Sequence, residues 1–102
     1  MEKKKAEDFG VREIVLEEIC WLAKKYGLKK VILFGSRARG DFWRASDIDL
    51  AVEGGDILNF ALDVDEATPT LLKYDFVDLG RPIQEDLAQA IKKEGIVLYE
   101  EI

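Results

Sequence analysis

Gly35-Ser36 and the aspartates Asp47 and Asp49 have the types and spacing of a site for a metal-bound triphosphate, with ten residues between Ser36 and Asp47. The Ser36 hydroxyl and nearby backbone N–H groups can bind phosphate oxygens, and Gly35 leaves room for their approach. Asp47 and Asp49 are two positions apart, so in a strand they point to one side, roughly 7 Å from each other. Carboxylates placed in this way can share one or two hard cations, and Mg²⁺ is the expected ion. The pattern therefore indicates phosphoryl-transfer chemistry.

The segments around these residues are expected to hold them on neighbouring strands. The apolar run Val31-Ile32-Leu33-Phe34 predicts a buried strand over about 30–34 that ends at Gly35. A phosphate-binding loop is expected over 35–45. Residues 47–53 alternate polar and apolar side chains, which predicts a second strand with both aspartates on one face.

The remaining elements alternate along the chain. Helical spacing predicts a helix over about 8–26 that ends at Gly27, and a second over 57–67 with Asp56 as its N-cap. Strands are expected at about 74–79 and 96–99, and between them a helix with Pro82 as its first residue. The order predicts an α/β (α+β) fold in which residues 1–102 form one domain, a mixed, roughly four-stranded sheet packed by about three helices.

The stretch GSRARGDFWRASDIDL, residues 35–50, resembles the DNA polymerase beta-like nucleotidyltransferase superfamily. The short chain is similar to the minimal nucleotidyltransferases that act as antitoxins of HEPN-domain toxins. This resemblance implies the polymerase beta-like fold and an ATP-dependent protein adenylyltransferase. It would transfer AMP from ATP to a hydroxyl, expected to be a tyrosine, of a HEPN toxin encoded nearby, as the antitoxin of a type VII-like pair.

The resemblance also implies a third metal-associated carboxylate on a later strand. Residues 73–79 are the candidate segment, and they offer Asp75 and Asp78. The two aspartates point to opposite faces of a strand, so only one can join the site. The family pattern favours Asp75, with Asp78 as the alternative, and Asp47, Asp49 and Asp75 are then the catalytic and metal-binding residues.

Five residues are predicted to bind the nucleotide: Gly35, Ser36, Arg37, Arg39 and Ser46. An arginine fork suits phosphate oxygens, although either arginine could instead pair with Asp41 or be solvated. Phe42 and Trp43 could stack on a base, meet a partner or pack on the adjacent helix. Trp21, in the first helix, is assigned to the core or to a helix interface.

The composition excludes some kinds of site and indicates the compartment. The chain has no histidine, which excludes a histidine general base and a histidine zinc site. Cys20 is the one cysteine, so no disulfide can form within the chain and a reducing compartment is expected. No apolar run approaches the roughly 20 residues that span a membrane, which predicts a cytoplasmic protein.

Charge is distributed unevenly along the sequence. Residues 1–49 carry 11 basic and 9 acidic side chains, whereas residues 50–102 carry 4 basic and 12 acidic ones. The acidic second half makes extended nucleic acid an unfavourable partner, because such binding depends on neutralising phosphates. A basic protein partner fits this surface, and a solvated acidic surface is the alternative.

Two other functions and the state of assembly stay open at this stage. A binding module could neutralise its partner by contact alone, with the motif unused. A small-molecule nucleotidyltransferase, acting on an antibiotic for instance, would need an acceptor pocket that 102 residues hardly provide. A homodimer or hetero-oligomer that covers apolar surface is also expected, with the first helix as the candidate interface.

Overall fold

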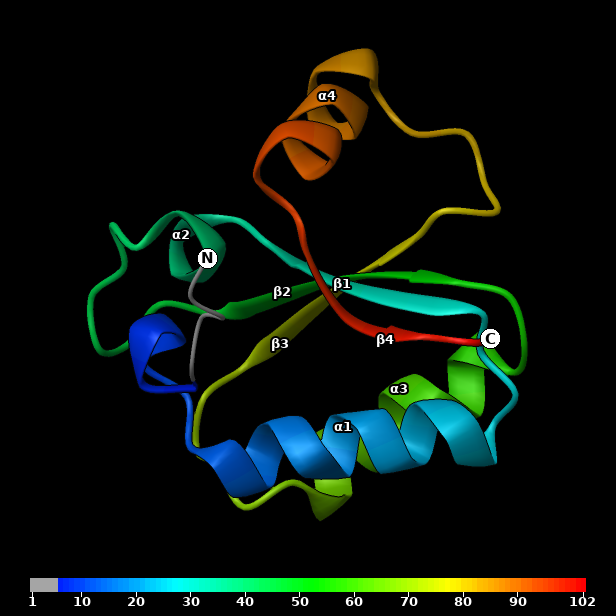
Figure 1. The fold of residues 1–102 in the computed structure, drawn as a ribbon, viewed down its shortest axis with the longest axis horizontal. Coiled ribbons are helices and arrows are strands. Elements are labelled where there is room, and N and C mark those ends of the chain that lie inside the picture. The colour runs from blue at the N-terminus through cyan, green and yellow to red at the C-terminus, as the bar shows by residue number, and fades with distance from the viewer. Residues whose placement is uncertain (1–5) are drawn as a thin grey trace.

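The computed structural model describes residues 6–102 and contains a four-stranded sheet with helices on both faces (Figure 1). The strands are β1 (Lys30–Phe34), β2 (Ile48–Glu53), β3 (Tyr74–Asp78) and β4 (Ile96–Glu100). The helices are a 3₁₀ turn η1 (Ala6–Phe9), then α1 (Glu13–Lys25), α2 (Ser36–Arg39), α3 (Ile57–Ala67) and α4 (Glu85–Glu94). The prediction of one domain over 1–102 includes residues 1–5, which lie outside the described part, and it stays a prediction.

The strand order in the sheet is β3-β2-β1-β4. β1 runs antiparallel to both β2 and β4, whereas β2 and β3 are parallel. The predicted mixed four-stranded sheet is therefore confirmed. The helices in residues 6–102 are more numerous than the three expected, because a short helical turn, α2, forms inside the predicted loop 35–45.

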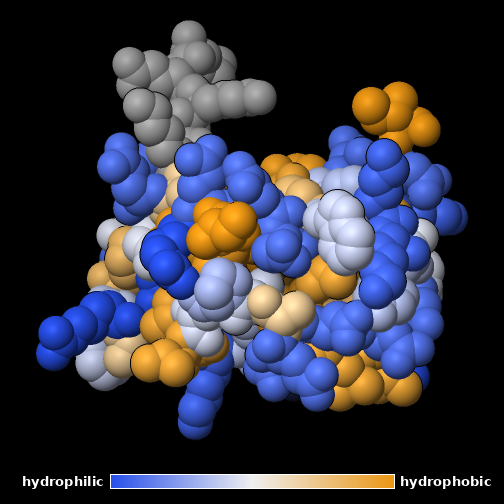
Figure 2. Space-filling view, turned by 90° about the horizontal axis from the view of Figure 1, so that it is seen from below, coloured by the Kyte–Doolittle hydropathy of each residue, from blue (hydrophilic) through white to orange (hydrophobic). Residues whose placement is uncertain are grey.

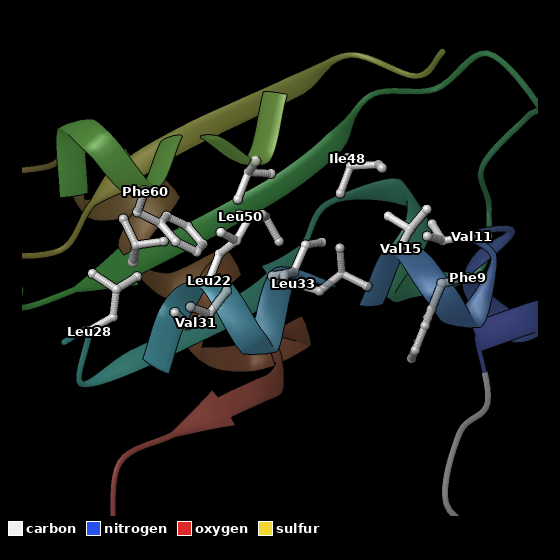
Figure 3. Packing of buried hydrophobic residues seen from close by; sticks show 14 of the residues in the cluster. Phe9, Val11, Val15, Leu22, Leu28, Val31, Leu33, Ile48, Leu50 and Phe60 are labelled. Atoms are coloured by element: carbon white, nitrogen blue, oxygen red, sulfur yellow. The ribbon is translucent and has the colours of Figure 1, made fainter. Parts of the chain in front are cut away.

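The two faces of the sheet are covered unequally. Helices α1 and α3 lie on one face and α4 lies on the other (Figure 1). Between the sheet and the α1/α3 layer, side chains such as Leu22, Leu33 and Phe60 form the larger core (Figure 3). The α4 side holds a smaller cluster around Phe34, Ala51 and Ile91. Burial of each large apolar side chain contributes about 1.5–3 kcal/mol, so the α1/α3 face supplies most of the stability.

Two helix starts differ from those expected. The first helix begins at Glu13 rather than near residue 8, because Gly10 has a positive φ of 66° and separates η1 from α1. The last helix begins at Glu85 after Gln84, so Pro82 lies in the preceding turn and is not the first helical residue. Glu85 and Asp86 occupy its first turn, where acidic side chains favour a helix start.

The ends of β1 and α3, which are encoded by nearby residues, agree closely with the prediction. β1 spans the expected residues, and α3 covers 57–67 as expected. Asp56 caps α3, because its Oδ1 accepts a hydrogen bond from the N–H of Asn59 at 3.3 Å. Such a cap typically stabilises a helix by about 1 kcal/mol.

The outer surface of the α1/α3 layer is mostly hydrophilic, with separate hydrophobic patches (Figure 2). The assignment of Trp21 to the core is wrong, since its side chain is 59% exposed and lies beside the ammonium group of Lys25. Cys20, on the same helix, is half-buried and its Sγ donates a hydrogen bond to the Leu98 carbonyl at 3.2 Å. No helix within residues 6–102 has the length and apolar character needed to cross a membrane.

Candidate active site

The candidate site lies where β1 ends and where β2 and β3 begin. Asp49 pairs with Phe34 of β1 on one side and with Asp75 of β3 on the other. Residues paired in adjacent strands direct their side chains to the same face, so Asp49 and Asp75 both point toward the α4 side. Asp47 directly precedes β2 and is exposed. The structure therefore brings the three predicted carboxylates to one corner of the sheet.

The clear electrostatic consequence of this arrangement is a raised pKa of Asp49. Burial raises its pKa to about 6, and the charges of Asp75 and Asp47 add to the rise. Arg39 opposes the shift, while Glu94 reinforces it. The carboxylates thus repel one another and favour a cation, which is the behaviour expected of a site that binds metal ions.

Gly35 is required for the position of Asp49. Its φ is 78°, a conformation that side chains other than glycine rarely adopt. A Cβ at this position would lie 2.2 Å from Asp49 Oδ2, well inside van der Waals contact. The glycine predicted from phosphate binding is therefore also the residue that leaves space for the carboxylate of the neighbouring strand.

The donor chemistry of the site fits Mg²⁺, which prefers carboxylate oxygens. Even so, no group of three or more Cys, Asp or Glu side chains within residues 6–102 converges closely enough to hold a metal ion as it stands. Asp47, Asp49 and Asp75 would have to change side-chain rotamers to bind one ion together. A metal site formed by these three residues stays a prediction.

The guanidinium of Arg37 is directed to backbone carbonyl oxygens, which argues against the predicted contact with nucleotide phosphate. The side chain is 1% exposed, and its guanidinium donates to the carbonyl oxygens of Phe9, Gly10, Arg44 and Ser46 at 2.8–3.2 Å. Burial lowers its pKa, although the nearby charges of Asp47 and Asp49 act in the opposite direction. Arg37 neither pairs with Asp41 nor is solvated. It instead ties η1 to the loop before β2.

Phe42, Trp43 and Ser46 shape the same loop. The Phe42 ring lies 4.9 Å from the Arg37 guanidinium carbon and packs against Gly10, so Phe42 and Trp43 do not form an exposed pair. Trp43 alone is open to solvent, at 70% exposure. Ser46 Oγ accepts a hydrogen bond from the Trp43 N–H at 3.0 Å, and its role toward a nucleotide stays a prediction.

Arg39 lies at the site and has two acidic partners. Its Nε is 3.1 Å from Asp41 Oδ2, and its Nη1 is 2.8 Å from Glu94 Oε2. Hydrogen bonding to Asp41 raises the pKa of Arg39, against the effect of burial. The alternative pairing of Arg39 with Asp41 is therefore present, and half of its side chain is still open to solvent.

Glu94 is the residue that the sequence interpretation missed. It comes from the last turn of α4, and its Oε2 also accepts a hydrogen bond from the Gly35 N–H at 2.7 Å. One sequence signal could have pointed to it. An acidic residue at the C-terminal end of a helix opposes the helix dipole, so its presence after Lys92 and Lys93 suggests a tertiary partner.

Asp78, the alternative third carboxylate, lies away from the site. It pairs with Val52, whose side chain belongs to the larger core on the α1/α3 face. Its Oδ1 accepts the Gly80 N–H at 2.8 Å, and its Oδ2 is 3.4 Å from Arg81 Nε. Asp78 stabilises the turn after β3, and Asp75 is the aspartate of this strand that stands beside Asp49.

Known proteins resemble this chain in both sequence and structure. A family model described as "Polymerase beta, Nucleotidyltransferase" matches residues 17–101. A Methanocaldococcus jannaschii protein named "Putative protein adenylyltransferase" is 37% identical over 81 residues, which are 71% of this chain and 79% of that protein.

Two solved structures share the fold of this chain. A toxin-antitoxin with AMP-PNP has a TM-score of 0.67 and 30% identity, over 84% of this chain and 73% of that one. A mutant of the toxin-antitoxin MntA-HpeT, in which two aspartates are changed to glutamate, has a TM-score of 0.66 and 28% identity over the same shares.

Proposed function

Because this chain belongs to the polymerase beta nucleotidyltransferase family, we propose that it is an Mg²⁺-dependent protein adenylyltransferase that transfers AMP from ATP to a hydroxyl group of a toxin partner. The observation that carries the proposal is the pairing of Asp49 with Asp75 beside Gly35 at one corner of the sheet. The name of the archaeal relative and the AMP-PNP bound in a structural neighbour support adenylyl transfer as the reaction.

Nucleotide binding would use the turn after β1. Ser36 offers its hydroxyl, and the backbone N–H groups of the turn offer further donors for the β- and γ-phosphates. Arg39, half exposed beside them, supplies a guanidinium that can bind a phosphate oxygen. Asp47, Asp49 and Asp75 would hold Mg²⁺, which when bound neutralises charge on the triphosphate and on the departing pyrophosphate.

The reaction is an in-line displacement at the α-phosphorus. The hydroxyl oxygen of the acceptor forms a new bond to phosphorus while the bond to the oxygen bridging the α- and β-phosphates breaks. Pyrophosphate leaves with that electron pair. Asp75 is the exposed carboxylate of the pair and can accept the proton of the hydroxyl, unless it takes up a second metal ion.

The acceptor in this proposal is a tyrosine of a HEPN toxin, and the chain acts as its antitoxin. The toxin-antitoxin pairs among the structural neighbours support a toxin as partner. The acidic second half of the sequence, with 12 acidic and 4 basic residues, favours a basic surface on that partner. The partner supplies the acceptor hydroxyl, and this chain binds the nucleotide and supplies the carboxylates.

The test is label transfer from ATP. The purified protein is incubated with Mg²⁺, ATP labelled in the α-phosphate and the protein encoded next to it, and label is followed by gel and intact mass. Label on the neighbour should appear with the wild type and with Asp65→Ala, an exposed acidic residue on α3, but not with Asp47→Ala/Asp49→Ala. A tight complex without label in any variant would refute transfer to this partner and leave neutralisation by contact.

The third carboxylate has a matched control on the same strand. Asp75→Asn should reduce transfer by at least about 100-fold, as loss of a proton acceptor typically does. Asp78→Asn removes an equal charge three residues away but on the other face, and transfer should stay within about two-fold of wild type. Equal losses in both variants would argue against Asp75 as the residue of the site.

A further inference from the structure

The carboxylate of Glu94 binds two groups that the proposed function assigns to phosphate. Its Oε2 is 2.7 Å from the Gly35 nitrogen and 2.8 Å from Arg39 Nη1. The side chain is 16% exposed, so α4 and the turn after β1 hold it in place. Glu94 and Gly35 are 59 positions apart in the sequence, and the fold alone brings them together.

A carboxylate oxygen and a phosphate oxygen need the same kind of donor. Both are anionic acceptors, and both form short, charge-assisted hydrogen bonds with N–H groups and with guanidinium. The Gly35 N–H carries one hydrogen, so it cannot make a full hydrogen bond to Glu94 and to a phosphate oxygen together. Binding of a triphosphate at this N–H therefore requires Glu94 to leave.

We propose that Glu94 competes with the triphosphate of the nucleotide for the Gly35 N–H and for Arg39, and so sets the affinity of the site. This inference rests on the proposed function, because it assumes that a nucleotide binds at the turn after β1. Glu94 is the last residue of α4 and is joined to β4 through Gly95. Displacement of its side chain by a phosphate exchanges one anion for another at Gly35 and frees Arg39 to bind the phosphate.

The negative charge of Glu94 would by itself weaken the binding of a triphosphate. The test must therefore separate charge repulsion from competition for the hydrogen-bond donors. Glu94 also raises the pKa of the nearby Asp49, so its charge is felt across the site. Glu94→Gln removes the charge and keeps the shape. Glu94→Asp keeps the charge and withdraws the carboxylate by one methylene from Gly35, which weakens the contact without removing the repulsion of a polyanion.

The experiment is a titration of the full chain with ATP and Mg²⁺ by isothermal calorimetry, together with an amide spectrum that follows Gly35. Both Glu94→Gln and Glu94→Asp should bind ATP at least about ten-fold tighter than wild type, and the Gly35 amide signal should move in both variants before ATP is added. Glu85→Gln, at the other end of α4, is the control and should match wild type.

The failures of the two proposals can be told apart. If wild type binds ATP and neither Glu94 variant binds more tightly, competition is refuted while nucleotide binding stands. If only Glu94→Gln gains affinity, repulsion by charge explains the effect and competition for contact is again refuted. If neither wild type nor any variant binds ATP, the proposed nucleotide site itself is wrong, and the inference falls with it.

Discussion

Arg37 should be a determinant of folding and not of nucleotide binding. Its guanidinium makes five hydrogen bonds to four backbone carbonyl oxygens, and the side chain is 1% exposed. Arg37→Lys keeps the positive charge but replaces the planar fork by a single ammonium group with three donors. The substitution therefore tests the geometry of the guanidinium and leaves the net charge unchanged.

The expected loss can be worked out from the unmatched carbonyls. A lysine ammonium can reach either the carbonyls of Phe9 and Gly10 or those of Arg44 and Ser46, so two of the four stay unsatisfied, and each unsatisfied buried carbonyl costs about 1–3 kcal/mol. The free energy of unfolding should fall by about 2–6 kcal/mol in total. For a domain of this size each kcal/mol lowers Tm by about 4–8 °C, so the melting temperature should drop by at least about 8 °C.

Arg39→Lys is the matched control for this measurement. Arg39 lies two residues further along the same short helix, with its side chain 45% exposed in ion pairs to Glu94 and Asp41. Exposed ion pairs contribute about 0–1 kcal/mol, so Tm should change by only a few degrees. Thermal melts followed by circular dichroism, together with ATP titrations, measure both effects. An Arg37→Lys protein that melts like wild type and loses ATP affinity would refute the structural role.

Two further substitutions test the packing and the charge of the site. Gly35→Ala should lower the free energy of unfolding by about 2–4 kcal/mol in urea titrations, from strain at positive φ and the clash with Asp49. Gly27→Ala, at a φ of 68° where an added Cβ would meet no other part of the fold within 4 Å, should cost only about 1–2 kcal/mol, and equal losses would contradict the clash. The pKa of Asp49 is raised to about 6 from 3.8, so the folded state binds its proton more tightly and stability falls as pH rises through this range. Asp49→Asn should therefore raise Tm at pH 7.5 in a chelating buffer and leave it nearly unchanged at pH 4, and a lower Tm at pH 7.5 would contradict the predicted repulsion.

Local patterns were sufficient where an element is encoded by its own residues. The apolar run before Gly35 predicted β1, and the Asp56 cap with its following helical pattern predicted α3. The motif over residues 35–50 also led to the superfamily, which the family model confirms. The starts of α1 and α4 were wrong because Gly10 and Pro82 mark turns whose extent depends on tertiary packing.

The sequence by itself determined the strands, the face that Asp47 and Asp49 share, and the family, because side-chain alternation and the motif over residues 35–50 are local properties. The register between β2 and β3 is not local, and it decided that Asp75 and not Asp78 stands beside Asp49. Only the tertiary structure decided the roles of Arg37 and Arg39, which have the same side chain two positions apart. The approach of η1 buries Arg37 among carbonyl oxygens, while the end of α4 brings Glu94 to Arg39 and Gly35. The partners on η1 and α4 lie 28 to 59 positions away along the chain, so no local pattern specifies them, and packing of distant elements determines which polar group each side chain meets.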